Sequence, residues 1–323
     1  MDTKKTMKTG NTWGKLLFIC FAVLGVFFSF SAYAAPQSFG EAKVQARQKI
    51  YADQNQSEQG TLYCGCKWTW AGKTGGRVDL DSCGYVPRKN ANRAARIEWE
   101  HIVPAWVIGH QRQCWQKGGR ENCTKTDPVF RVMEANLFNL APAIGEVNGD
   151  RSNYLYGMVA RTMPNQYGQC TTRTDFKERT IEPRDKVKGF VARVTFYMYD
   201  RYGLSMSKAQ QRILMAWDHQ FPVTAWEREL DNRVAKLMGH HNHYVTGEKV
   251  WELDQKPSRE GLQGIQQSAI NTGKQIIGNK KSNIYHLPNG CPSYDKVSEN
   301  NQIPFSSREE AEAAGYRLAG NCR

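Results

Sequence analysis

Eight cysteines behind an apolar leader constrain the fold of this chain more than any other feature. The chain has 323 residues and nine cysteines, of which Cys20 lies within the leader. An even number of cysteines in an exported protein predicts a framework of disulfides. The eight that follow the leader are Cys64, Cys66, Cys83, Cys114, Cys123, Cys170, Cys291 and Cys322.

Sequence spacing favours two disulfides and leaves the other pairings open. Cys114 and Cys123 close a short loop that contains Arg120, and Cys291 and Cys322 tie together the last part of the chain. So small a tail needs such a covalent link to be stable. Cys64 and Cys66 are separated by one residue, which is too tight for a redox C-x-x-C motif and for the usual spacing of zinc ligands.

Residues 1–34 have the pattern of a signal peptide. Four lysines precede an apolar run over residues 16–30, and Ala32 and Ala34 supply the small residues expected before a cut in front of Ala35. The apolar run is shorter than the roughly 20 residues that span a bilayer. We therefore expect a periplasmic or secreted protein, in an oxidising compartment, with no membrane attachment after cleavage.

The formal net charge of +13 remains strongly positive without the leader. A basic surface suits a polyanionic partner, because each neutralised phosphate releases condensed counterions. Solubility, or attraction to anionic lipid headgroups, would give a similar charge. Charge alone therefore leaves nucleic acid as one of several partners.

The pattern of apolar residues predicts an α+β protein in two folded parts. Residues 36–246 form one mixed domain, with helices expected over 37–52, 182–202, 207–217 and 223–238 and short strands within 60–85. Residues 247–275 are predicted to be a linker. Residues 276–323 form a small module, in which the capping box of residues 306–310 begins a helix that Gly315 ends.

Residues 96–106 carry the most informative string of the chain. An alternating run leads to Glu100 and His101, and Pro104 ends it. Neighbouring residues of a strand face opposite sides, so the two side chains are expected to serve one site in different roles. Residues 133–142 are a second strand candidate, and the polar sequence that follows residue 145 is a helix candidate. Two strands and a helix that carry an acid–histidine pair and Asn148 are the layout of a ββα-metal nuclease.

At these residues the chain resembles the bacterial endonuclease I family of His-Me finger nucleases. The most specific matches are EWEHIVPAW at 98–106 and GEVNGDRSN at 145–153, within a likeness that covers residues 40–245. The resemblance implies a ββα-metal core surrounded by helices. It also implies a monomeric, sequence-nonspecific endonuclease that hydrolyses DNA, and possibly RNA, to 5′-phosphate products. The implied cofactor is Mg²⁺, with Mn²⁺ or Ca²⁺ as substitutes.

The resemblance also implies a role for each candidate residue. Glu100 and Asn148 would bind the metal, His101 would be the general base, Arg120 would contact a phosphate, and Glu134 would hold a metal-bound water. The residue types fit, since Mg²⁺ needs only one or two protein oxygens and histidine titrates near neutrality. Asn139 is a further candidate, which would orient the loop of His101 by hydrogen bonding.

Two other motifs are weaker. His240, His241 and His243 resemble a metal-binding tract, but the endonuclease I family does not usually have histidines there, so we expect no site. The tail resembles the small zinc module of the Ada DNA-repair protein at residues 290–292 and 314–317. That module uses four cysteines, whereas only Cys291 and Cys322 remain here, so a disulfide in an accessory nucleic-acid-binding module is expected.

Two other functions fit parts of the sequence, and a third can be excluded. A basic DNA-binding or DNA-uptake protein with an inactive nuclease fold would share the charge, but the intact Glu100, His101 and Asn148 argue against it. A hydrolase for another phosphodiester would share the site. A zinc protease is excluded because the chain lacks the His-Glu-x-x-His helix.

Overall fold

The computed structural model describes residues 1–2, 35–263, 275–288, 291–305 and 307–322. The predicted signal peptide therefore lies outside the described residues, apart from the first two. No helix among the described residues is long and apolar enough to cross a membrane. Four disulfides join the eight cysteines: Cys64–Cys170, Cys66–Cys83, Cys114–Cys123 and Cys291–Cys322. The two pairings favoured by spacing are confirmed, and the structure supplies the other two.

The centre of the fold is a strand pair followed by a helix. Strand β3 (Ile97–His101) pairs antiparallel with β4 (Leu140–Ile144), so that Glu100 lies opposite Ala141 and His101 opposite Leu140. Helix α7 (Gly145–Arg151) begins directly after β4. The predicted α+β class is confirmed, and β3, β4 and α7 have the predicted strand–strand–helix order.

The second strand candidate is wrong over its first half. Met133 and Glu134 end helix α6 (Pro128–Glu134), and a 3-10 turn (η3, Leu137–Asn139) follows before β4 begins. These residues are helical because of the local sequence before them. The Asp127 side chain accepts a hydrogen bond from the backbone N–H of Phe130, and Pro128 occupies the first turn of the helix. The rest of the β3–β4 connection contains the short helices α3 (Ala105–His110), α4 (Gln113–Gln116) and α5 (Gly119–Thr126).

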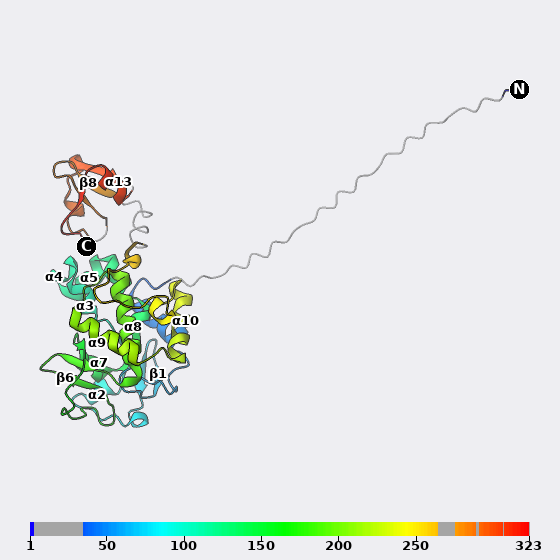
Figure 1. Ribbon diagram of the computed structural model, residues 1–323, viewed down its shortest axis with the longest axis vertical. Coiled ribbons are helices and arrows are strands. Elements are labelled where there is room, and N and C mark those ends of the chain that lie inside the picture. The colour runs from blue at the N-terminus through cyan, green and yellow to red at the C-terminus, as the bar shows by residue number, and fades with distance from the viewer. Residues whose placement is uncertain (3–34, 264–274, 289–290, 306, 323) are drawn as a thin grey trace. The chain divides into compact units, whose positions relative to one another are not determined.

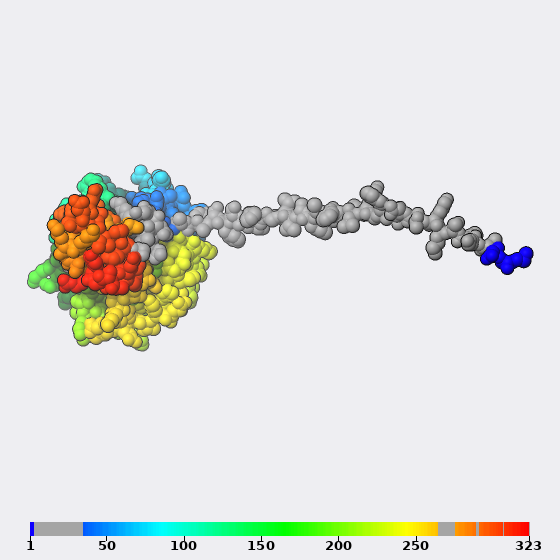
Figure 2. Space-filling model, turned by 90° about the horizontal axis from the view of Figure 1, so that it is seen from above, coloured from blue at the N-terminus to red at the C-terminus, as the bar shows by residue number. Residues whose placement is uncertain are grey.

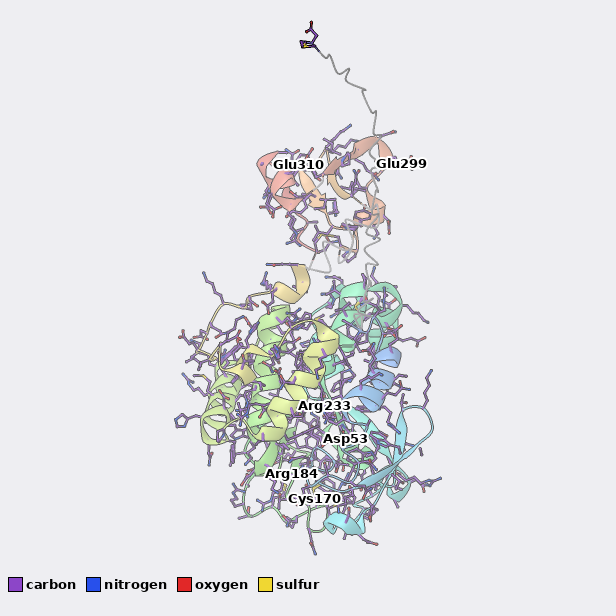
Figure 3. The ribbon with its side chains drawn as sticks, turned by 90° about the vertical axis from the view of Figure 1, so that its right-hand side faces the viewer. Asp53, Cys170, Arg184, Arg233, Glu299 and Glu310 are labelled. Atoms are coloured by element: carbon purple, nitrogen blue, oxygen red, sulfur yellow. A yellow bond between two sulfur atoms is a disulfide. The ribbon has the colours of Figure 1, made fainter. Side chains whose placement is uncertain are left out.

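Three long helices follow later in the chain (Figure 1). They are α8 (Asp185–Tyr202), α9 (Lys208–Gln220) and α10 (Ala225–Met238), as the apolar spacing predicts. Most residues of helix α8 are buried, and Gly203 ends it with a positive φ of 64°. The short helix α11 (His243–Thr246) follows. Arg233 of α10 holds Asp53 by two hydrogen bonds, and Figure 3 shows these two residues side by side.

Short elements complete the part of the chain before the C-terminal module. The N-terminal helix α1 (Phe39–Gln45) continues as a π-helical turn (η1, Ala46–Ile50). Strands β1 (Trp68–Ala71) and β2 (Gly75–Val78) form a hairpin, which the turn η2 (Asp81–Cys83) and the helix α2 (Ala91–Ala94) follow. Strands β5 (Leu155–Tyr156), β6 (Arg173–Asp175) and β7 (Thr180–Glu182) form a third small sheet in the order β5-β7-β6.

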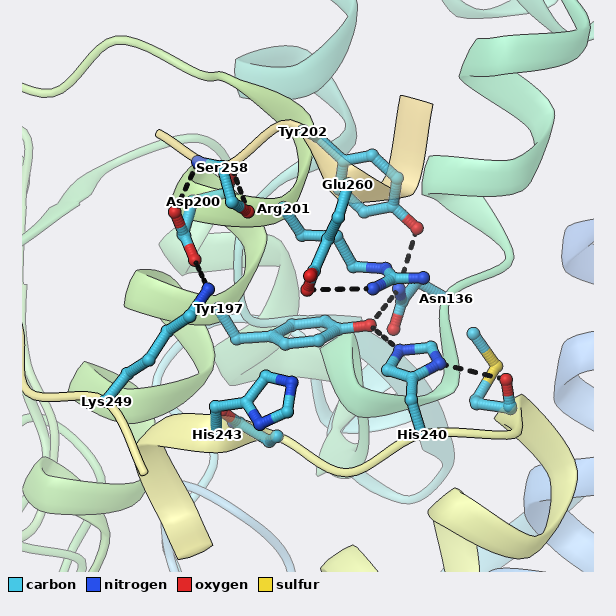
Figure 4. A network of polar contacts seen from close by, with 12 residues as sticks. Asn136, Tyr197, Asp200, Arg201, Tyr202, His240, His243, Lys249, Ser258 and Glu260 are labelled. Atoms are coloured by element: carbon cyan, nitrogen blue, oxygen red, sulfur yellow. Dashed lines mark hydrogen bonds and ion pairs between the residues drawn. The ribbon is translucent and has the colours of Figure 1, made fainter. Parts of the chain in front are cut away.

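Residues 248–262 pack against the helices, although the sequence predicts a linker from 247. Trp251 is buried and stacks on Phe196 of α8 at 4.9 Å, and its indole N–H donates to Gln211. Figure 4 shows Lys249 and Ser258 bonded to the Asp200 carboxylate at 2.7 and 2.6 Å. The apolar pattern of this segment is weak because Trp251 is its main core residue. The packed residues thus continue to 262, beyond the predicted boundary at 246.

The C-terminal module has its own sheet and core. Strands β8 (Ile276–Asn279), β9 (Ile284–His286), β10 (Gln302–Phe305) and β11 (Arg317–Leu318) pair in the order β10-β8-β9-β11. Two 3-10 turns (Tyr294–Lys296 and Glu299–Asn301) and α13 (Arg308–Ala313) complete it. Tyr285, Phe305 and Ala311 are buried among its residues, which Figure 2 shows in orange and red as one compact cluster.

Candidate active site

One cleft is lined by four of the candidate residues, Glu100, His101, Arg120 and Asn148. It has a volume of about 770 Å³ and is lined by residues of α1, β3, α3, α5 and α7. Glu100 and His101 both line it, although they are neighbours in sequence. His101 is the last residue of β3, where the backbone leaves the sheet, so its ring reaches the same cleft. Arg120 and Asn148 line other walls of the cleft.

The His101 ring is buried and anchored through one nitrogen. Its Nε2 lies 2.8 Å from the backbone carbonyl oxygen of Glu134. A carbonyl only accepts, so Nε2 carries the proton and Nδ1 keeps its lone pair. Phe39 of α1 packs on the ring at 4.6 Å. Burial, together with the positive charge of Arg120, lowers the pKa of His101 to about 3, so the imidazole is neutral at physiological pH.

Asn139 fixes the backbone that follows His101. Its side-chain Oδ1 accepts from the N–H of Val103 at 2.7 Å, and its Nδ2 donates to the carbonyl of the same residue at 2.9 Å. Asn139 is fully buried, so these bonds replace the water that its amide would otherwise need. The prediction that Asn139 orients the His101 loop is confirmed by this pair of hydrogen bonds.

The Glu100 carboxylate is buried and held from one side. Its Oε1 accepts from the Tyr63 hydroxyl at 2.6 Å and lies 3.2 Å from the Arg151 guanidinium. Burial raises the pKa of Glu100, although Arg151 and Tyr63 oppose that shift. Arg151 also donates to the carbonyls of His101 and Ile102, so one buried cation braces both the acid and the strand that carries it.

Asn148 is oriented by a second acid. Its Nδ2 donates to Glu98 Oε2 at 3.0 Å, which turns its Oδ1 away from Glu98. Glu98 in turn accepts from Arg93 at 2.9 and 2.7 Å and from Arg96 at 3.0 and 2.9 Å. Burial acts to raise the pKa of Glu98, but the hydrogen bonds from Arg93 and Arg96 hold it below its ordinary value.

Arg120 and Glu134 form a pair beside the base. The guanidinium Nε donates to Glu134 Oε1 at 2.5 Å. The arginine side chain is 46% exposed and the glutamate side chain 3%, so the cation faces the solvent of the cleft and the acid lies beneath it. Arg120 belongs to α5, which the Cys114–Cys123 disulfide joins to α4.

Comparison with known proteins identifies the family of this chain. The sequence profile of the family described as Endonuclease I matches residues 38–248. The chain belongs to the endonuclease I family. A periplasmic deoxyribonuclease of Aeromonas hydrophila is 50% identical over 191 residues, 59% of this chain and 79% of that protein. An Endonuclease-1 of Buchnera aphidicola subsp. Baizongia pistaciae is 48% identical over 210 residues, 65% and 83% of the two chains.

Membership confirms the prediction that the chain is an endonuclease, a hydrolase. An extracellular deoxyribonuclease of Aeromonas hydrophila is 47% identical over 232 residues, 71% of this chain and 96% of that protein. The names of such relatives place them in the periplasm or outside the cell. The four disulfides agree with the predicted oxidising compartment.

The histidine tract of this endonuclease I chain is divided among separate partners. His240 lies 2.9 Å from the Tyr197 hydroxyl (Figure 4), His241 contacts Asp231, and His243 contacts Glu248. Among the described residues, the group His286, Cys291 and Cys322 has the mutual distances of a metal site. Its two cysteines are bonded to each other, as expected for the tail.

Sequence reasoning missed three residues that brace the site. Glu98 had a signal, because residues two apart on a strand share a face and Glu98 therefore lies on the side of Glu100. Arg151 lies within the GEVNGDRSN match at 145–153, but nothing in that string links it to Glu100. Tyr63 had no signal, since it reaches Glu100 from a residue far away in sequence. Their role depends on the Cys64–Cys170 disulfide region and on the end of α7.

Proposed function

We propose that this chain is a periplasmic or secreted, sequence-nonspecific endonuclease that hydrolyses DNA phosphodiesters with one divalent metal and His101 as the general base. The observation that carries the proposal is the meeting, in one cleft, of a neutral anchored imidazole with the oriented oxygens of Glu100 and Asn148. The names of the relatives, periplasmic and extracellular deoxyribonuclease, support DNA as the substrate.

The residues fit a hard divalent cation. Glu100 offers a carboxylate whose other oxygen is already held by Tyr63 and Arg151, and Asn148 offers an amide oxygen. Mg²⁺ prefers oxygen ligands and keeps several waters, so one acid and one amide in an open cleft suffice. When bound there, the ion would supply positive charge to the scissile phosphate and its leaving oxygen. Mn²⁺ and Ca²⁺ favour the same oxygen donors.

His101 is built to take a proton. Its Nε2–H donates to the Glu134 carbonyl, so its Nδ1 is the atom that accepts the proton of an attacking water. The low pKa keeps this atom unprotonated at neutral pH. In-line attack of water on phosphorus, with O3′ leaving, gives 5′-phosphate products. The carbonyl of Glu134 also stabilises the imidazolium that forms, because it accepts a stronger hydrogen bond from it.

Arg120 is placed to contact the phosphate. Its guanidinium is half exposed at the cleft and its orientation is fixed by Glu134. A planar guanidinium recognises phosphate through paired N–H donors. We assign the Glu134 carboxylate to positioning Arg120, in addition to the contact with a metal-bound water that the family resemblance implies.

We also propose that residues 1–34 are removed on export and that the mature chain begins at Ala35. Support comes from the sequence of the leader and from the compartments named for the relatives. N-terminal sequencing of the protein recovered from the periplasm or medium tests this. A mature chain that still starts at Met1 would contradict it.

A plasmid assay separates the enzyme from an inactive binding protein. The purified mature protein is incubated with supercoiled DNA, single-stranded DNA and RNA, each with Mg²⁺ and with excess chelator. We expect cutting of DNA that the chelator abolishes, and products that a 5′-phosphate-dependent exonuclease degrades. Retarded but uncut DNA in Mg²⁺ would show instead a nucleic-acid-binding protein with an inactive nuclease fold.

A further inference from the structure

The turn between β6 and β7 holds an aromatic side chain in solvent. Phe176 is 39% exposed, so its ring is accessible to a ligand. The turn is fixed because the Asp175 carboxylate accepts from the backbone N–H groups of Lys177 and Glu178 at 3.0 and 2.9 Å. Gln166 holds the preceding strand by two hydrogen bonds to the backbone of Thr174.

Two arginines stack on aromatic rings around this turn. The Arg88 guanidinium lies over the Phe176 ring at 4.4 Å, and that of Arg179 lies over the Tyr154 ring at 4.9 Å. The two rings meet edge to face at 6.4 Å. We call Arg88, Tyr154, Phe176 and Arg179 the Phe176 patch. It presents alternating cations and ring faces, the combination that binds single strands of nucleic acid.

The cations of the patch differ in how far they are neutralised. Arg88 makes a bidentate pair with Asp150 at 2.9 and 2.7 Å, which fixes the guanidinium over Phe176 but balances its charge. Arg179 is exposed, and its Nη2 donates to the neutral amide oxygen of Asn153 at 2.7 Å. Arg179 is therefore the cation that remains able to attract a phosphate.

The Phe176 patch continues the cleft of the active site. Asn153, the partner of Arg179, lines that cleft, and Tyr154 is its neighbour in sequence. Both follow directly from α7, the helix that carries Asn148. The backbone N–H of Leu155 donates to the carbonyl of Arg179, so the two halves of the patch are joined. A strand that leaves the cleft along this wall meets the patch next.

We propose that the Phe176 patch is a second substrate contact, which binds the strand flanking the scissile phosphate. An unpaired base stacks on Phe176 or Tyr154, and its phosphate pairs with Arg179. The inference rests on the proposed nuclease function and deepens it, because it assigns the site a preference for strands whose bases are unpaired. In a duplex the bases are stacked on each other and their faces are not available to the rings.

Binding measurements with Phe176→Ala test the proposal. The probes are a fluorescent single-stranded DNA of about 12 nucleotides, within the usual span of single-strand sites, and a blunt duplex of the same sequence. Fluorescence anisotropy is measured in chelator, so that neither probe is cut. We expect the Kd for the single strand to rise about five- to tenfold, which is the low end of the effect usually seen when one base loses its stacking partner. The Kd for the duplex should change far less, and Phe176→Trp should bind the single strand as the wild type does.

Arg179→Gln tests the phosphate contact separately. We expect the variant to bind the single strand more weakly. The slope of log Kd against log salt concentration should also fall by about one, the contribution of one phosphate contact. In Mg²⁺, both variants should raise KM for single strands and leave kcat near the wild-type value. Leu253→Ala and Arg228→Gln are matched controls, since Leu253 has an exposure of 38% and Arg228 is exposed on α10.

The outcomes separate this inference from the proposed function. A wild type that cuts DNA, with Phe176→Ala and Arg179→Gln equal to their controls, would overturn the second contact alone. An equal loss for single strand and duplex would overturn the stacking of an unpaired base. Variants that instead lose binding to anionic phosphatidylglycerol vesicles would assign the patch to a lipid surface. A wild type that cuts no nucleic acid would overturn the proposed function itself.

Discussion

At the scale of single residues, the site depends on which end of each polar side chain is already occupied. His101 uses Nε2 for the Glu134 carbonyl, Glu100 uses Oε1 for Tyr63 and Arg151, and Asn148 uses Nδ2 for Glu98. Each bond leaves the other end of the group for the reaction. The burial that fixes these orientations also shifts the pKa of the base.

The first prediction concerns the pH dependence of cleavage. Burial lowers the pKa of His101 to about 3, so the base stays neutral as the pH falls through 6.5. The single-turnover rate at saturating Mg²⁺ should therefore change little between pH 7.5 and 5.5. An ordinary histidine would lose roughly tenfold over that interval. Saturating metal is needed because protons compete for Glu100, whose pKa is raised by burial. A tenfold fall with a midpoint near 6.5 would contradict the assignment of a buried neutral base.

The second prediction assigns Glu98 to positioning Asn148. Glu98→Ala removes the acceptor of the Asn148 Nδ2, so the amide is free to turn its oxygen away from the metal. Loss of such a supporting contact typically lowers metal affinity roughly 10- to 100-fold. Extra Mg²⁺ should restore kcat. Glu121→Ala is the control, since Glu121 is an exposed acid paired with Lys125. Equal Mn²⁺ affinities of the two variants by calorimetry would remove Glu98 from the site.

At the scale of elements, disulfides hold short pieces that lack a core of their own. Helices α4 and α5 are short, and the Cys114–Cys123 bridge joins them where Arg120 enters the cleft. The Cys64–Cys170 bridge fixes the loop of Tyr63 in the same way. Arg184 adds hydrogen bonds to the carbonyls of Gln59 and Leu62, and Figure 3 shows Arg184 near Cys170.

The third prediction is that reduction inactivates the enzyme. Loss of a native disulfide typically costs ~2–5 kcal/mol, comparable with the stability of a whole domain. Thiol reductant should abolish cutting at 37 °C, and the double substitution of Cys114 and Cys123 by serine should lower kcat through Arg120. The same pair of substitutions at Cys291 and Cys322 is the control, because it lies outside the nuclease family match. Full activity with all eight thiols shown free by mass spectrometry would refute this prediction.

The elements show how far sequence reasoning reaches. Helices α8, α9 and α10 follow from apolar spacing and local caps, and β3 follows from alternation up to Pro104. The predicted start of the second strand at residue 133 is wrong. Asp127 and Pro128 begin a helix that continues through Glu134, although these residues also suit a strand. The contacts of Tyr63 and Arg151 with Glu100 could not be found, although Arg151 lies within the GEVNGDRSN match, since contacts between distant residues leave no local pattern.

At the scale of the whole molecule, the packed nuclease part extends further along the chain than the sequence pattern indicates. Apolar residues become sparse after residue 246, but the chain stays packed beyond that point. Trp251 stacks on Phe196 of α8. Lys249 and Ser258 form hydrogen bonds with Asp200, and Glu260 accepts one from Arg201. The C-terminal module has a separate core with its own disulfide. We expect a division of labour, in which the module adds affinity for nucleic acid and the nuclease part cuts.

The fourth prediction compares two truncated chains. A chain that ends at Gln263 should stay folded and cut DNA, with weaker binding at moderate salt, because it lacks the basic residues Lys280, Lys281, Lys296 and Arg317. A chain that ends at Thr246 also lacks buried Trp251, and loss of a buried tryptophan costs about 3–5 kcal/mol. Thermal unfolding should therefore separate the two. Equal Tm values would show that residues 247–263 add no stability to the nuclease part, and a folded but inactive chain ending at Gln263 would refute the division of labour.

The most direct test of the account compares His101→Ala with Glu100→Ala, using Mn²⁺ and Mg²⁺ titration by calorimetry beside single-turnover cleavage of DNA. His101→Ala should bind metal and DNA as the wild type does and lose ~10²–10⁴-fold in rate, the usual contribution of a general base. Glu100→Ala should bind metal more weakly and regain part of its rate when more metal is added. Unchanged metal affinity in Glu100→Ala, or full activity in His101→Ala, would contradict the assignment of the site.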